Sequence, residues 1–194
     1  MKNKLSTKTL VLGAVLTALV FLLQYLGAFI KLGPFSISLV LIPIVIGAAT
    51  CGVGISTWLG LVFGAAVLLS GDAAAFLAVS VGGTLLTVLA KGILCGLCAG
   101  LVYQGVLRLT KNTLLAVIAA AIVCPVVNTG IFLLGCLAFF MEPIAQWTAA
   151  AGLGGDVAQY MIFVLVGGNF LFELATNIIL SPVATRLLKI QEKQ

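Results

Sequence analysis

The sequence predicts an all-α polytopic membrane protein, in which about six transmembrane helices form a single integral membrane domain over residues 1–194. Hydrophobic residues make up 62% of the chain and charged residues only 8%, whereas soluble domains carry about a quarter charged residues. The mean hydropathy is +1.30, and the apolar residues occur in long uncharged runs. Such a chain cannot cover its surface with charge, so most of that surface must face lipid.

The apolar runs locate the helices, because about 20 apolar residues cross the hydrocarbon core of a bilayer. They predict helices near residues 9–29, 37–50, 55–70, 84–106, 114–141 and 158–188. The first run follows a short basic segment, as in a secretory signal peptide. It is too long for the apolar region of such a peptide, and no cleavage site of small residues follows it. We therefore interpret it as the first membrane helix.

The second and third runs are short, and only residues 51–54 separate them. They predict a tight helical hairpin, whose first helix is tilted or irregular after Pro43. The last run is longer than the membrane requires, so we expect it to extend into the cytoplasm. Glycines at four-residue spacing in the third and fourth helices predict close helix packing. They are Gly60 and Gly64, then Gly92, Gly96 and Gly100.

Basic residues at the ends of the runs set the orientation, since cytoplasmic loops carry an excess of Lys and Arg. With an even number of helices both termini lie on one side. That side then also holds most of the basic residues, namely Lys2, Lys4, Lys8, Arg108, Lys111, Arg186, Lys189 and Lys193. The opposite loops, near residues 30–36, 71–83 and 142–157, carry more acidic than basic residues. We therefore predict that both termini are cytoplasmic and that these loops are external.

Composition also excludes several function classes. Membrane topology explains the net charge of +5, and no Lys/Arg cluster with interleaved aromatics indicates a nucleic-acid partner. The chain has no His, which excludes His-ligated haem and zinc, and we expect neither a metal nor another cofactor. The cysteines lie mostly in apolar runs, unlike those of a disulfide framework. No G-x-x-x-x-G-K-[ST] motif is present, so ATP-driven transport would need a partner.

Two ionisable side chains fall at membrane depth, where a charge is costly and is therefore a candidate for function. Lys91 lies roughly 10 Å inside the fourth predicted helix, and Glu173 lies near the middle of the last one. Asn169 and Asn177 share a helical face with Glu173, and Asn128 adds an amide in the fifth helix. We expect an externally open pocket for a small polar solute, lined by Lys91, Asn128, Asn169 and Glu173. Asn177 is deeper and fits a structural role. Alternatively, Lys91 and Glu173 only pair with each other, and the asparagines hold helices together.

Aromatic residues in the predicted external segments are candidates for a lid over such a pocket. Phe35 lies in the first segment, and Trp147 and Tyr160 lie near the edges of the third, which is rich in Ala and Gly. Loops with aromatics, glycines and few charges can fold over a cavity mouth. We therefore count all three among the substrate-binding candidates. Alternatively, Trp147 and Tyr160 belong to the aromatic belt at the membrane surface.

Cys95 and Cys98 have the C-x-x-C spacing of thiol redox enzymes. A membrane oxidoreductase could use such a pair, but no second pair in an external loop is present to relay electrons. The glycines around the pair favour another interpretation, in which both cysteines are small residues of a packing surface.

The first helix carries the small-residue motif Ala14-x-x-x-Ala18. This motif, the basic N-terminus and the predicted helices together resemble the substrate-binding S component of an energy-coupling factor (ECF) vitamin transporter. Residues 35–48 and 54–64 are similar in style to the second and third helices of such proteins. The resemblance covers essentially the whole chain.

This resemblance implies a bacterial plasma-membrane transport subunit rather than an enzyme. It implies that Ala14 and Ala18 dock on a transmembrane coupling subunit, which two cytoplasmic ATPase subunits drive. It also implies a pocket in the external half, with Lys91 and Asn169 in its walls. A vitamin would be captured outside and carried inward when the subunit topples within the membrane.

No set of residues identifies the vitamin from the sequence. Lys91 favours an anionic solute, so we expect a small acid such as pantothenate. Riboflavin comes next, although few aromatics beyond the three loop residues are available to stack on a large flat ring. Functions of two other classes stay open, an intramembrane thiol redox enzyme that uses Cys95 and Cys98, and a stand-alone facilitator for small solutes.

Overall fold

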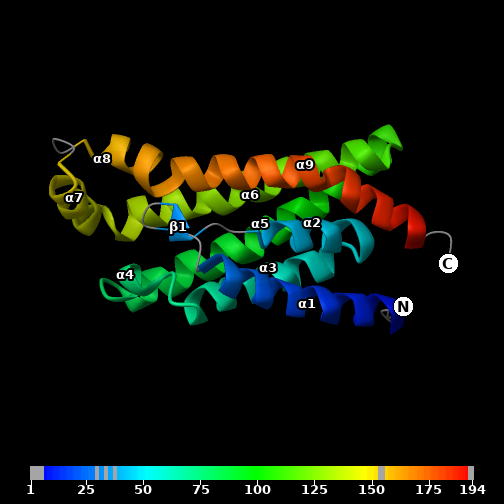
Figure 1. Ribbon diagram of the computed structural model, residues 1–194, viewed down its shortest axis with the longest axis horizontal. Coiled ribbons are helices and arrows are strands. Elements are labelled where there is room, and N and C mark those ends of the chain that lie inside the picture. The colour runs from blue at the N-terminus through cyan, green and yellow to red at the C-terminus, as the bar shows by residue number, and fades with distance from the viewer. Residues whose placement is uncertain (1–6, 29–30, 33–34, 37–38, 153–155, 192–194) are drawn as a thin grey trace.

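The computed structural model (Figure 1) describes residues 7–28, 31–32, 35–36, 39–152 and 156–191, the side chains of 28, 31–36 and 187–191 excepted. Nearly all of the described chain is helical. Its elements are α1 (Thr7–Ala28), β1 (Lys31–Leu32), β2 (Phe35–Ser36), α2 (Leu41–Thr50), α3 (Val53–Leu69), α4 (Ala74–Leu77), α5 (Val81–Thr110), α6 (Thr113–Phe139), α7 (Met141–Ala150), α8 (Val157–Gln159), the π-helix η1 (Tyr160–Gly167) and α9 (Gly168–Gln191).

The described helices confirm the predicted all-α polytopic fold. Four of them are long and apolar enough to cross a membrane, namely Thr7–Gly27, Val81–Thr110, Thr113–Phe139 and Val157–Arg186. The apolar helices α2 and α3 are shorter, as predicted for the hairpin. Each predicted helical range overlaps one of these apolar helices.

The predicted external loops contain more regular structure than the sequence indicates. The first holds the antiparallel strands β1 and β2, in which Lys31 pairs with Ser36, and the second holds the short helix α4. The third begins with α7, because the predicted helix at 114–141 already ends at Phe139. Phe140 leaves the helical conformation there, with φ −130° and ψ 14°. Pro143 fits the first turn of α7, where a missing backbone N–H costs little.

Local interactions define the turns between the long helices. Gly52 joins α2 to α3 with a φ of 85°, which a residue without a Cβ adopts readily. Ser80 caps α5 by accepting a hydrogen bond from the Gly83 N–H at 3.2 Å. Lys111 ends this helix with a φ of 53°. Asn112 then begins α6, since its Oδ1 accepts from the N–H groups of the next helical turn.

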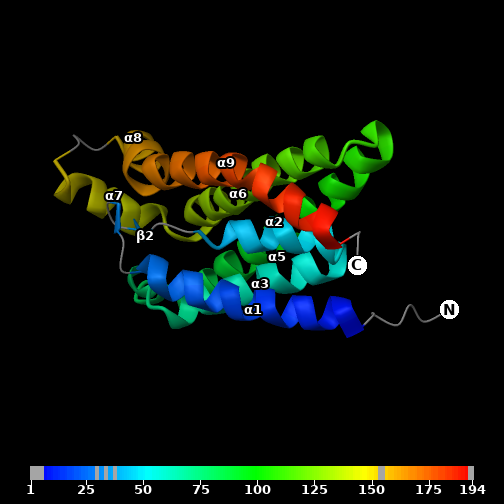
Figure 2. The ribbon, with the colours of Figure 1, turned by 45° about the vertical axis from the view of Figure 1, so that its right-hand side comes forward.

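The helices lie roughly along one direction and give the molecule two distinct ends (Figures 1 and 2). The start of α1, the end of α9, the α2–α3 turn and the α5–α6 turn gather at one end. The strands and α4, α7 and α8 gather at the other. The segments predicted to be external therefore lie together, away from the predicted cytoplasmic turns.

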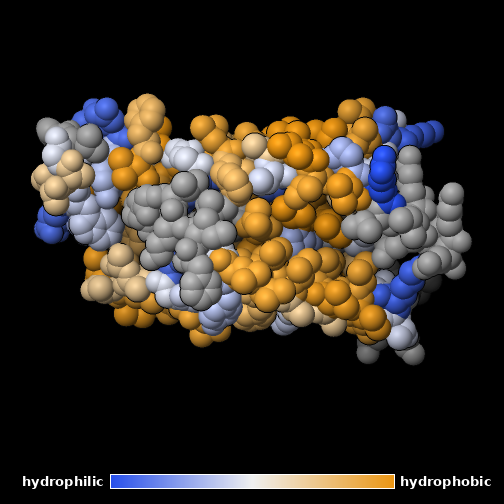
Figure 3. All heavy atoms as spheres, viewed as in Figure 1, coloured by the Kyte–Doolittle hydropathy of each residue, from blue (hydrophilic) through white to orange (hydrophobic). Residues whose placement is uncertain are grey.

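The surface shows the pattern expected of a protein in a bilayer. On the face in Figure 3, hydrophobic residues cover most of the middle of the molecule, and hydrophilic residues concentrate towards its two ends. Exposed large apolar side chains come from most of the long helices, including Leu22, Leu101, Leu134 and Ile179. Lipid, rather than water, is the solvent that such a surface fits.

Candidate functional site

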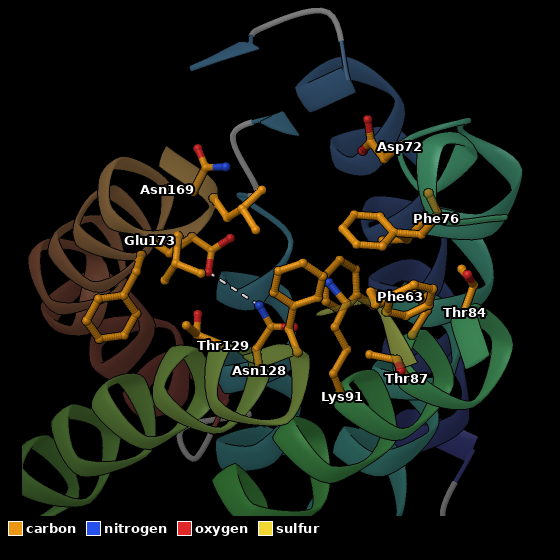
Figure 4. A pocket seen from close by; sticks show the side chains of 18 of the residues that line it. Phe63, Asp72, Phe76, Thr84, Thr87, Lys91, Asn128, Thr129, Asn169 and Glu173 are labelled. Atoms are coloured by element: carbon orange, nitrogen blue, oxygen red, sulfur yellow. Dashed lines mark hydrogen bonds between the residues drawn. The ribbon is translucent and has the colours of Figure 1, made fainter. Parts of the chain in front are cut away.

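A cavity lies between the helices in the half of the molecule that contains α4. Its volume is ≈ 100 Å³, and a single water molecule needs only about 10–15 Å³ of such space. Residues from α1, α3, α4, α5, α6, η1 and α9 line it (Figure 4). The polar lining residues are Gln24, Asp72, Thr84, Thr87, Lys91, Asn128, Thr129, Asn169 and Glu173. The structure thus brings together the four polar residues that the sequence places in a common pocket.

Lys91 enters the cavity from α5 (Figure 4). It lies about 15 Å along the helix from Val81, because α5 begins earlier than the sequence predicts and each residue adds about 1.5 Å. Its Nζ atom lies 5.3 Å from the Phe63 ring centroid and 5.5 Å from that of Phe132. Within the described part of the chain no ion pair joins Lys91 to Glu173 or to another residue. Two aromatic faces stabilise the ammonium group while leaving it available to an anion.

Glu173 on α9 and Asn128 on α6 also line the cavity. Both are buried, with exposed fractions of 6% and 5%. The Asn128 Nδ2 donates a hydrogen bond of 3.5 Å to the Glu173 Oε2 (Figure 4). Among the described residues nothing donates to the Asn128 Oδ1. A buried acceptor without a donor is costly, which indicates that water or a solute completes this site.

The two other asparagines differ in their roles. Asn169 lines the cavity, and its buried Oδ1 accepts no hydrogen bond from the described residues. Asn177 does not line it; its amide donates to the Glu173 backbone carbonyl at 2.8 Å, and its own Oδ1 likewise accepts no hydrogen bond from the described residues. The geometry agrees with the interpretation of Asn177 as structural and of Asn169 as a pocket residue.

One wall of the cavity is built by an irregular helix. The sequence predicts an uninterrupted helix at 158–188, but the structure has the π-helix η1 in its first part. Gly167 suits this wider turn, since a Cβ there would lie 2.7 Å from the Ile162 carbonyl oxygen. π-helical segments are rare and often occur at functional sites. Here η1 leads directly into the turns of α9 that carry Asn169 and Glu173.

Aromatic side chains are more abundant in the cavity than the sequence indicates. Its apolar lining includes Phe63, Phe76, Phe132, Phe140 and Phe170. The expectation that few aromatics are available to a flat solute is therefore wrong. No periodicity separates these phenylalanines from those that face lipid, so the sequence offered no signal for them.

Gln24 and Asp72 also line the cavity, although neither is among the pocket residues that the sequence predicts. The buried Gln24 on α1 donates hydrogen bonds to the Asp72 carboxylate and, at 3.2 Å, to the Ser70 hydroxyl. These bonds connect α1 to the corner between α3 and α4. The sequence does contain an indication for Gln24, because a polar residue within an apolar run is a candidate for a buried functional site.

The predicted loop aromatics lie beside the cavity or outside the described residues. The Trp147 ring packs edge-on against Phe76 with centroids 5.4 Å apart. Tyr160 is buried in the same apolar cluster, and neither residue lines the cavity in the described part of the chain. The Phe35 side chain is outside what the structure describes. Trp147 and Tyr160 therefore support a lining residue rather than contact the cavity themselves.

The other singled-out residues are separate from the cavity. Ala14 and Ala18 are exposed on the outer face of α1. Cys95 is buried, and its thiol donates to the Gly92 carbonyl oxygen at 3.1 Å. Cys98 is half-buried, and neither cysteine lines the cavity.

The fold and the cavity are those of a multi-pass membrane protein that can enclose a small solute between its helices. The family model described as the substrate-specific component of the ECF transporter matches residues 8–188. The chain belongs to this family of substrate-specific components, as the resemblance in its sequence implies. It is a transport subunit of the plasma membrane, which associates with an ECF module and takes a small-molecule ligand. No curated protein and no solved structure matches the chain.

Proposed function

We propose that this subunit captures a small water-soluble vitamin from outside the cell and delivers it through a coupling subunit that two ATPase subunits drive. The solute carries an anionic group that lies against Lys91. Pantothenate is an example of such an acid. Riboflavin is the next candidate, and the phenylalanines that line the cavity make it a better one than the sequence alone indicates.

The observation that carries this proposal is the position of Lys91. Its ammonium group faces a cavity between the helices, beside two phenyl rings, and forms no ion pair with the described residues. A charge at membrane depth is costly unless it meets a partner or water. An anionic solute supplies that partner each time the cavity is filled.

The docking proposal concerns the exposed face of α1 that carries Ala14 and Ala18. Ala14 and Ala18 leave a smooth surface, and between them the Thr17 Oγ1 accepts a hydrogen bond of 3.2 Å from the Trp58 indole. Small residues allow a neighbouring membrane helix to approach closely. We propose that a helix of the coupling subunit packs here.

Mass spectrometry of the purified full-length protein tests the proposed function. We expect a small acid to copurify with the protein in mild detergent, and the coupling and ATPase subunits to copurify from its own membranes. The Lys91→Met variant serves as the comparison and should lose the acid but keep the subunits. A protein that carries no solute and binds none of a panel of water-soluble vitamins in isothermal titration would contradict the proposal.

A further inference from the structure

The charges around the cavity do not match a solute that is only an anion. The lining includes one basic residue, Lys91, and two acidic residues, Asp72 and Glu173. If Lys91 and Glu173 are both ionised, an anionic group that pairs with Lys91 leaves the Glu173 carboxylate without a cation among the described residues that line the cavity. Unbalanced charge is expensive in a poorly hydrated site. The solute therefore needs a group that the acidic side of the cavity can hold.

The two carboxylates differ in how far they are already engaged. Asp72 accepts from the Gln24 amide. Glu173 has one donor among the described side chains, the Asn128 amide, at the long distance of 3.5 Å. A carboxylate offers about four acceptor positions. Glu173 is thus a buried carboxylate with unused acceptor capacity that lines a cavity (Figure 4).

The surroundings of Glu173 supply more acceptors. The Asn128 Oδ1 and the Asn169 Oδ1 both lack a donor in the described part of the chain, and both residues line the cavity. Lining oxygens without donors are matched by a solute group with several N–H or O–H bonds. An ammonium group offers three N–H donors and one positive charge, so it balances both the hydrogen bonds and the charge.

We infer that the solute is bipolar, with an anionic group against Lys91 and a hydrogen-bond-donating group, best an ammonium, against Glu173, Asn128 and Asn169. This inference rests on the proposed function and names the chemistry of its solute. Figure 4 shows Lys91 and Glu173 reaching into the cavity from different helices, with Asn128 between them. The phenyl rings of Phe63 and Phe132 lie on the Lys91 side, where they fit an apolar or aromatic middle part of the solute.

Three probes of nearly equal shape test the inference. They are para-aminomethylbenzoate, para-hydroxymethylbenzoate and para-ethylbenzoate, which share the carboxylate and the ring and differ in one terminal group. Their affinities for the purified full-length protein are measured by isothermal titration or by ligand-observed NMR. We expect the ammonium probe to bind at least about tenfold more tightly than the ethyl probe, with the hydroxyl probe between them, as hydrogen bonds to a charged group predict.

Two variants assign the effect to its residues. Glu173→Gln keeps the shape but removes the charge, so the advantage of the ammonium probe over the ethyl probe should fall below about threefold. A thermal unfolding transition like that of the unmodified protein shows that the variant is folded. Glu142→Gln is the matched control, because it removes an exposed carboxylate from α7 that does not line the cavity. It should keep the full advantage of the ammonium probe.

The outcomes separate this inference from the proposed function. Equal binding of the three probes, or an ammonium advantage that survives Glu173→Gln, would overturn the bipolar solute. So would the absence of binding by all three probes from a protein that still copurifies with an anionic solute, and in that case the proposed function stands. If neither a probe nor a copurifying solute is found, both fail.

Discussion

Gly60 on α3 and Gly92 on α5 bring the backbones of their helices into direct contact. A Cβ atom on Gly60 would lie 2.1 Å from the Gly92 carbonyl oxygen, and one on Gly92 would lie 2.3 Å from the Gly60 carbonyl oxygen. One turn further along α5, a Cβ on Gly96 would lie 2.1 Å from the Ser56 carbonyl oxygen. Because Lys91 directly precedes Gly92, this crossing also holds the Lys91 backbone close to α3, the helix that carries Phe63.

The first prediction concerns this crossing. Gly92→Ala places a methyl group against a backbone carbonyl, so α3 and α5 must separate. We expect the free energy of unfolding to fall by about 1–3 kcal/mol, as for overpacked cores, measured by thermal unfolding in detergent. Gly105→Ala on the same helix is the control, because a Cβ there meets nothing within 4 Å. Equal stability of the two variants would contradict the backbone contact.

The sequence predicts the helices well because the bilayer imposes a length on every apolar run. It also selects several residues that line the cavity, because burial of a polar group has a high cost. Lys91 and Glu173 stand out because a charged side chain within an apolar run is costly to bury. Asn169 is predicted because its spacing from Glu173 places both residues on the same face of a helix. These arguments need only one helix at a time.

What the sequence does not reveal depends on contacts between helices. Phe132 beside Lys91 and a phenylalanine facing lipid have the same hydrophobic neighbours along the chain, and only the packed bundle separates them. The sequence does not reveal the π-helix η1 either, because a change from α-helical to π-helical hydrogen bonding does not require a different amino-acid composition. Asp72 is visible as a loop charge, but its bond to Gln24 joins two segments that are distant along the chain.

The second prediction tests Lys91 by itself. Lys91→Met removes the ammonium group and keeps most of the side-chain volume, so the Phe63 and Phe132 rings retain their contacts. We expect the affinity for the anionic solute to fall at least about tenfold, or about 1.4 kcal/mol, in isothermal titration. Arg108→Met removes an exposed positive charge near the end of the same helix and should leave the affinity unchanged. An unaltered affinity in Lys91→Met would remove Lys91 from the site.

The third prediction separates solute binding from thiol chemistry. Cys95 and Cys98 lie away from the cavity, and the Cys95 thiol is already bonded to the Gly92 carbonyl. Replacing both with alanine should therefore leave the affinity for the solute within about threefold, a change below 1 kcal/mol. Uptake by the complete transporter should also persist. Loss of uptake with intact binding and normal assembly would instead favour a redox role for the pair.

The fourth prediction concerns the exposed face of α1. Replacing Ala14 and Ala18 together with tryptophan fills the smooth surface and keeps another helix at a distance. We expect the coupling and ATPase subunits to be lost from the purified complex, as seen by size-exclusion chromatography and protein mass spectrometry. Solute affinity should stay the same, because neither alanine lines the cavity.

A matched control decides whether such a loss is specific. Ala138→Trp adds the same bulk to an exposed position on α6, so it tests whether any large side chain on the outer surface disturbs assembly. If Ala138→Trp keeps the subunits while the α1 variant loses them, docking belongs to α1. If the α1 variant loses solute binding as well, the close packing of α1 on α3 through Thr17 and Trp58 would explain the result, and the docking assignment would be wrong.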